Sequence, residues 1–165
     1  MESQPLPDWQ EKNMMPLVSR PLGTLIVVME DPAVSLDSPH GNRKIVKITG
    51  GSLIGPRLRA EVLPGGGDWA LFRGDGVLSI DVRLTLRSHD GAMIYMTYSG
   101  MRYAVPEAAA RLARNEHVEP AEMYFRMSAV FETGDDRYAW LNRILSVGVG
   151  ERLKVGPRYH LHEIL

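Results

Sequence analysis

Two alternating runs joined by a short turn constrain the fold of this chain more than any other part of its sequence. Apolar and polar side chains alternate strictly over residues 80–87, and they alternate again over residues 94–99. A period of two is typical of a β-strand with two chemically different faces. The sequence therefore predicts a β-hairpin with one apolar face and one polar face.

The turn of this hairpin sets which residues lie opposite each other. His89-Asp90-Gly91 predicts a three-residue loop with Gly91 in the left-handed conformation, whereas a two-residue turn at Asp90-Gly91 would shift the register by one. We prefer the first, because it keeps like faces together. It pairs Asp81 with Ser99, Arg83 with Thr97, and Thr85 with Tyr95.

Composition excludes several classes of protein. The chain has 165 residues, a net charge of −1 and no cysteine. Its length suits one domain with a sizeable core. Without a basic stripe or a long apolar run, we expect no binding to nucleic acid or membrane. The missing cysteines exclude disulfides and cysteine-ligated zinc, and no N-terminal signal peptide is evident, so we expect a cytoplasmic protein.

The rest of the chain adds strands and one helix. Further strands are predicted at residues 22–29, 43–54, 56–64, 69–73, 123–131, 138–147 and 158–165, with loops at 30–42 and 148–156. Pro106 begins a predicted helix over 106–115 whose narrow apolar stripe suits a surface position. This pattern predicts an all-β fold, a closed antiparallel β-barrel of about eight strands with one short surface helix. We expect residues 1–16 to form a flexible arm and residues 17–165 the single barrel domain.

Three segments carry a resemblance to a known family. Residues 39–69, 75–95 and 122–142 resemble the bacterial and fungal family called domain of unknown function 3237, through blocks such as ITGG, GPRL, VLPGG and FETGD-x-RYAWLN. The likeness covers roughly residues 20–165. It implies a small calycin-like barrel and, for some relatives, cofactor-independent lyase activity on aromatic acids. Ala60 departs from an expected Gly, and Tyr98 and Met101 occupy variable positions that imply an effect on substrate choice.

Function depends on which sheet face turns inward, since a barrel of this size is either filled or holds one small ligand. In one orientation Val82, Leu84, Met96 and Phe125 form a packed core, and the charged side chains lie in water. In the other, the polar face lines a cavity and the apolar face is covered by the helix, the arm or another subunit. The sequence leaves both orientations open.

A cavity lined by the polar face would suit an organic acid. An arginine would bind the carboxylate as a bidentate fork, a carboxylate would pair with that arginine or act as general base, and a tyrosine would donate a proton. The catalytic candidates are Asp81, Arg83, Tyr95, Tyr124 and Arg126, and the substrate-binding candidates are Glu61, Trp69, Tyr98, Trp140 and Asn142. The alternative for Asp81 and Arg83 is a structural ion pair. His160 and His162 share a strand face but lack a third ligand, so we predict no metal site.

We therefore predict a cofactor-independent lyase, of decarboxylase or eliminase type, or an isomerase acting on a small aromatic or unsaturated carboxylic acid. One alternative is a non-catalytic calycin-like protein that binds a hydrophobic or aromatic small molecule. Another is a dimer subunit with a filled core. We expect a homodimer and no cofactor.

Overall fold

One curled antiparallel sheet makes up most of the molecule, in a computed structural model that describes residues 15–165. Its ten strands are β1 (Ser19–Met29), β2 (Val34–Ser38), β3 (Gly41–Ile54), β4 (Arg59–Val62), β5 (Gly66–Phe72), β6 (Leu78–Ser88), β7 (Met93–Ala104), β8 (Met123–Glu132), β9 (Ser146–Leu153) and β10 (Gly156–Ile164). The helices are α1 (Pro106–Ala113) and two 3-10 helices, η2 (Pro120–Glu122) and η3 (Asp136–Arg143). No helix within residues 15–165 is long and apolar enough to cross a membrane.

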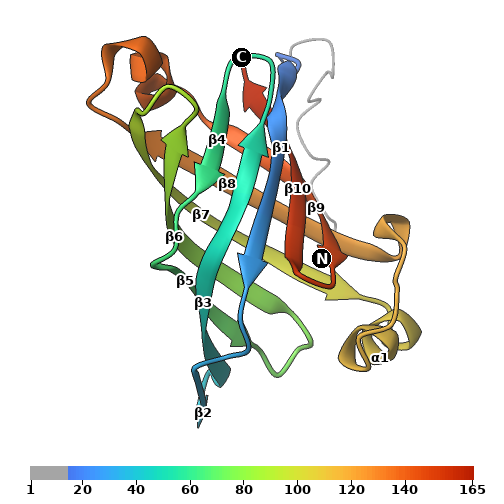
Figure 1. Cartoon of the computed structure of the whole chain (residues 1–165). Coiled ribbons are helices and arrows are strands. Elements are labelled where there is room, and N and C mark those ends of the chain that lie inside the picture. Colours follow the sequence, from blue (N-terminus) through green and yellow to red (C-terminus); the bar gives the residue numbers. More distant parts are fainter. Residues whose placement is uncertain (1–14) are drawn as a thin grey trace, which may run out of the picture.

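The sheet closes on itself because β1 pairs with β10 at one edge and with β3 at the other. β4 and β5 both bridge β3 and β6, so the barrel has eight strand positions, and β2 extends beyond it on β3 (Figure 1). The predicted closed antiparallel barrel is confirmed. The predicted arm lies outside the described residues, apart from residues 15 and 16.

The hairpin of β6 and β7 has the predicted register. Asp81 pairs with Ser99, Arg83 with Thr97 and Thr85 with Tyr95. Gly91 has a φ of 90°, in the left-handed region, so the three-residue turn is confirmed.

Two predicted elements near the C-terminus are wrong. The predicted strand over 138–147 is replaced up to residue 143 by η3, because the Asp135 side chain accepts a hydrogen bond from the Arg137 N–H and caps this helix, and only residues 146 and 147 belong to a strand, β9. The Asn142 side chain then holds η3 to both backbone groups of Thr133, at 2.8 and 2.9 Å. Residues 148–156 are not a loop, since most of them continue β9 between β8 and β10. The predicted loop over 30–42 also contains β2.

The apolar face of the sheet turns inward. Val82, Leu84, Met96 and Phe125 are buried in one continuous core. The orientation with a cavity lined by Asp81 and Arg83 is therefore wrong. Burying one large apolar side chain contributes about 1.5–3 kcal/mol, whereas burying a charge without full pairing is costly, so the alternation favours this side.

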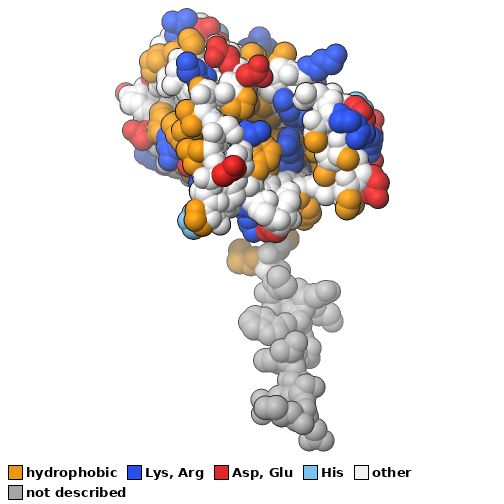
Figure 2. All heavy atoms as spheres, turned by 90° about the horizontal axis from the view of Figure 1, so that it is seen from below, with side chains coloured by type: hydrophobic (Ala, Val, Ile, Leu, Met, Phe, Trp, Pro, Cys, Tyr) orange, Lys and Arg blue, Asp and Glu red, His pale blue; other side chains and the backbone are white. Residues whose placement is uncertain are grey.

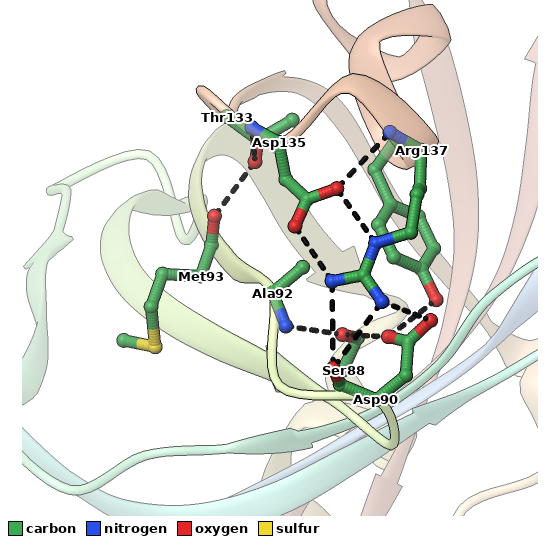
Figure 3. A network of polar contacts seen from close by, with 8 residues as sticks. Ser88, Asp90, Ala92, Met93, Thr133, Asp135 and Arg137 are labelled. Carbon is green, nitrogen blue, oxygen red and sulfur yellow. Dashed lines mark hydrogen bonds and ion pairs between the residues drawn. The ribbon is translucent and has the colours of Figure 1, made fainter.

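One end of the barrel is sealed by η3, which buries Tyr138 and Leu141. The Tyr138 hydroxyl donates to the Asp90 carboxylate at 2.9 Å. Arg137 pairs with that carboxylate at 3.0 Å (Figure 3). Arg137 also pairs with Asp135 at 2.7 Å. These contacts join η3 to the turn between β6 and β7.

A second contact holds the other side of η3. The Arg57 guanidinium lies 3.5 Å from the centroid of the Trp140 ring and pairs with the buried Glu163 carboxylate at 2.8 Å. Figure 1 shows η3, in orange, at one end of the barrel and α1, in yellow, at the other. We call the end near α1 and β2 the open end.

Candidate functional site

The catalytic candidates named from sequence lie on the outer face of the barrel. Asp81 and Arg83 form an ion pair at 3.3 Å with side chains 51% and 47% exposed, which matches the structural alternative. Arg83 lies over the Trp69 ring at 4.9 Å. Tyr95 and Tyr124 are exposed. This face offers no enclosed environment for acid–base chemistry.

The remaining candidates also have contacts outside the barrel interior, with one exception. Arg126 lies over the Tyr124 ring at 5.0 Å, and Glu61 pairs with Arg87 on the surface. Trp140 and Asn142 belong to η3 and hold the sealed end, as described above. Tyr98 alone points inward and is buried.

Around Tyr98 the structure gathers polar side chains that the sequence did not single out. They lie toward the open end of the barrel. With Tyr98 they comprise the buried Asp68 on β5 and Tyr159 on β10, the partly buried Arg102 on β7, and Arg152, exposed at the rim on β9. We call these five residues the inner site. Seen from the open end, the molecule is hollowed, and Lys and Arg side chains lie in the hollow beside hydrophobic ones (Figure 2).

Asp68 supplies a buried carboxyl group whose proton is exchangeable near neutral pH. Its side chain is 8% exposed, and its Oδ1 accepts a hydrogen bond from the Asp81 N–H at 3.2 Å. Burial raises the pKa of Asp68 to about 6, the nearby Asp81 charge adds to the rise, and the charges of Arg102 and Arg43 oppose it. A pKa near the working pH suits a general acid or base.

Three aromatic rings form a wall of the inner site. The Tyr159 ring meets the Tyr98 and Phe125 rings edge to face, with centroids 5.4 and 5.1 Å apart. The Tyr98 hydroxyl has no hydrogen-bond partner within residues 15–165. Burial, together with the Asp68 charge, raises the pKa of Tyr98 and of Tyr159, so both stay protonated and able to donate.

A glycine makes room for this wall. A Cβ atom at Gly150 would lie 2.7 Å from Phe125 Cγ and 2.9 Å from Tyr159 Cε1. Any larger residue at this position on β9 would push one of the two rings aside. The sequence pattern gave no sign of this, because Gly148 and Gly150 look like loop residues.

Arg102 carries a positive charge that no carboxylate within residues 15–165 pairs with. Its guanidinium lies 5.7 Å from the Phe125 ring centroid and makes no hydrogen bond or ion pair with any residue in the described part of the chain. Burial lowers the pKa of Arg102, and the charge of Arg152 at the rim lowers it further. A guanidinium in this situation offers its planar set of donors to a carboxylate or a similar anion.

No metal site competes with this interpretation in the part of the chain that the structure describes. Within residues 15–165 no group of three His, Cys, Asp or Glu side chains could hold a metal ion. His160 lies 3.2 Å from the Glu151 carboxylate, an ordinary surface contact.

Comparison with known proteins places the chain in a family. The family model described as "Protein of unknown function (DUF3237)" matches residues 18–164. The chain belongs to this family. A UPF0311 protein of Rhodopseudomonas palustris is 33% identical over 125 residues, which cover 76% of this chain and 82% of the relative. A UPF0311 protein of Bradyrhizobium diazoefficiens is 30% identical, over 86% of this chain and 93% of the relative.

Solved structures of other proteins share the fold of this chain. A conserved protein of unknown function from Rhodopseudomonas palustris superposes with a TM-score of 0.85 at 31% identity, covering 92% of this chain and 100% of that one. A β-barrel-like protein from Acinetobacter baumannii gives 0.80 at 33% identity, with 94% and 100% coverage. A chain from Penicillium herquei, described as an enzyme, gives 0.71 at 20% identity, with 93% and 98% coverage, and shares the fold alone.

Proposed function

We propose that the inner site binds a small aromatic or unsaturated carboxylic acid, and that Asp68 transfers a proton on the bound molecule without a cofactor. One observation carries the proposal. Arg102 is a partly buried guanidinium with no ion-pair partner among residues 15–165, in a site that also holds a carboxyl group with a pKa of about 6. An acid bound to Arg102 would bring its carbon skeleton to Asp68 and its ring to the aromatic wall.

The chemistry follows from what each group can do. Arg102 binds the carboxylate, and the Tyr159 and Phe125 rings pack against the unsaturated part of the ligand. Asp68 in its ionised form takes a proton from carbon, and in its protonated form returns one to another carbon. The protonated Tyr hydroxyls are suited to stabilise negative charge that develops on a ligand oxygen.

Within the class of lyases and isomerases, the arrangement favours a proton shift or an elimination. An ion pair with Arg102 stabilises the carboxylate, so it opposes the loss of that same group as carbon dioxide. Removal of a proton from a neighbouring carbon leaves the ion pair intact. The DUF3237 fold is compatible with catalysis, since the Penicillium chain of the same fold is described as an enzyme.

The test compares the inner site with the outer face. We would screen aromatic and unsaturated carboxylic acids for a rise in melting temperature, and then follow turnover by ultraviolet absorbance. Arg102→Met should lose binding by tenfold or more, whereas Arg83→Met, which removes the same charge from the outer face, should bind as wild type does. Equal binding by wild type and Arg102→Met would overturn the proposal.

Asp68→Asn separates an enzyme from a carrier. It keeps the shape of the side chain and an oxygen that can accept the Asp81 N–H, but it cannot exchange a proton. If the protein is an enzyme, the Asp68→Asn variant should still bind the acid, and its turnover should fall at least a hundredfold. A protein that binds acids in Arg102-dependent fashion, with no turnover in wild type, would instead be a non-catalytic carrier.

A further inference from the structure

The outer face of β6, β7, β8 and β9 carries two adjoining hollows that the inner site does not use. Their volumes are about 700 and about 560 Å3. They share Ser99, Ser128 and Val147, which lie side by side on neighbouring strands. The two hollows therefore form one trough, which we call the outer trough.

Strand pairing fixes the layout of the outer trough. Its floor runs across the strands from Asp81 through Ser99 and Ser128 to Val147. The wall toward the open end is the row that contains Met101, Arg126 and Val149, and the opposite wall contains Arg83, Thr97 and Val130. The small serines at the centre keep the floor low between two bulkier walls.

Apolar side chains gather around this trough. Six large ones that line it are 40–65% exposed, namely Met101, Tyr124, Val130, Leu145, Val147 and Val149. Monomeric proteins rarely expose a contiguous apolar patch of this kind, and such patches mark contact surfaces.

The charges of the outer trough differ between its parts. Asp81 lies at the β6 end of the floor, and its carboxylate is half exposed beside Arg83. Arg126 lies in the wall toward the open end and has no acidic partner in the described part of the chain. The far end of the floor is apolar at Val147. The opposite wall is apolar at Val130, with Thr97 beside it and Arg83 at its β6 end, next to Asp81.

We propose that a second copy of this chain occupies the outer trough, with the two sheets crossed at about 90°. The outside of a barrel is saddle-shaped, convex around the barrel and concave along its strands. Two identical saddles nest when one is turned by a quarter turn, because the convex direction of each then fits the concave direction of the other. A two-fold axis at about 45° to the strands relates the copies, as in an isologous dimer.

This symmetry predicts specific neighbours across the interface. It exchanges the two ends of the floor with the two walls. Of the two possible diagonals, we choose the one that carries the β6 end of the floor onto the wall toward the open end, so that Asp81 of one copy faces Arg126 of the other, and Val147 faces Val130. Opposite charges meet and apolar side chains meet, which makes the surface complementary to itself.

The size of the trough fits a dimer. Thirteen and twelve residues line the two hollows, with three in common, which gives 22 in all. A standard interface takes about 20–30 residues from each side.

Charge reversal tests the proposal. Light scattering during gel filtration should give twice the chain mass for wild type at micromolar concentration. Arg126→Glu and Asp81→Arg should each raise the dissociation constant tenfold or more, because each places like charges opposite each other. The double variant should recover most of the loss, whereas Arg59→Glu, on β4 outside the trough, should have no effect.

Circular dichroism would check that each variant is folded. Val147→Asp gives a second measurement, and it should dissociate the dimer without any rescue by Arg126→Glu. A monomeric wild type across the concentration range would overturn the proposal. So would a dimer that ignores both charge reversals, or one that the double variant fails to restore.

Discussion

The Asp68 carboxylate accepts a hydrogen bond from the backbone N–H of Asp81 at 3.2 Å, from one strand to the next inside the barrel. The pairing between β5 and β6 is interrupted at this level, between the pairs Asp68–Val82 and Leu71–Ser79. The side chain therefore satisfies a donor that the neighbouring strand leaves free. This bond fixes the carboxyl group within the inner site and lowers its pKa in opposition to burial.

Asp68→Asn should stabilise the protein at neutral pH. The native Asp68 keeps its proton up to a pH of about 6, whereas an unfolded Asp releases it near 3.8. The native state thus binds more protons between these values, and the unfolding free energy falls by up to about 3 kcal/mol as pH rises through this window. Urea unfolding at pH 7 should show the variant more stable than wild type, with the difference shrinking below pH 4. A less stable variant at pH 7 would contradict this account.

Binding of a carboxylate to the inner site should weaken as pH rises through about 6. Below this value Asp68 is neutral, and the ligand meets only the positive charges of Arg102 and Arg152. Above it, the ionised carboxylate repels the ligand. Calorimetric titration from pH 5 to 8 should show the loss in wild type and a flat profile in Asp68→Asn. A wild-type affinity that rises with pH would refute this role for Asp68.

Gly150→Ala should disturb the aromatic wall. Its methyl group would lie 2.7 Å from Phe125, so a ring must move, at a cost of about 1–3 kcal/mol in unfolding free energy. Gly134→Ala is the matched control, since nothing lies within 4 Å of a Cβ atom there. Thermal unfolding of both variants measures the difference, and ligand binding should fall in Gly150→Ala alone. Equal melting temperatures for Gly150→Ala and Gly134→Ala would contradict this prediction, because the aromatic rings would then move at no cost in stability.

Leu141→Ala should weaken the sealed end. Leu141 is fully buried under η3, and removing its side chain should cost about 2–5 kcal/mol. Leu17→Ala, at an exposed position, serves as control and should cost little. Hydrogen exchange should speed up most in η3 and in the turn between β6 and β7, which Arg137 and Asp90 connect. Faster exchange spread evenly over the barrel would argue against a local seal.

The sequence predicted the hairpin well because a strict period of two leaves one choice of register. It failed at η3, where the alternation of residues 138–147 imitates a strand and the decisive contacts come from Asp135 and Thr133 outside that run. It failed at β9 because Gly148 and Gly150 make room for side chains from other strands. Neither cause is local, so neither was visible in the segment itself.

The inner site escaped detection for a related reason. Arg102 continues the inward phase of β7, from Ile94 through Tyr98, so a polar residue in apolar phase was the available signal. Asp68 gives the same signal on β5. The predicted candidates Asp81 and Arg83 lie in the polar phase instead, where they pair with each other on the exposed face. The residue types expected for an acid-binding site are present, at other positions.

Because η3 seals one end of the barrel, we expect a ligand to reach the inner site from the hollow at the open end (Figure 2). A ligand that enters past α1 must also leave past it, so product has to dissociate before the next substrate binds. For an enzyme of this shape, product competes directly with substrate, and the turnover rate cannot exceed the rate of product release. Reaction progress curves should then curve early, because accumulating product occupies the inner site and inhibits the reaction.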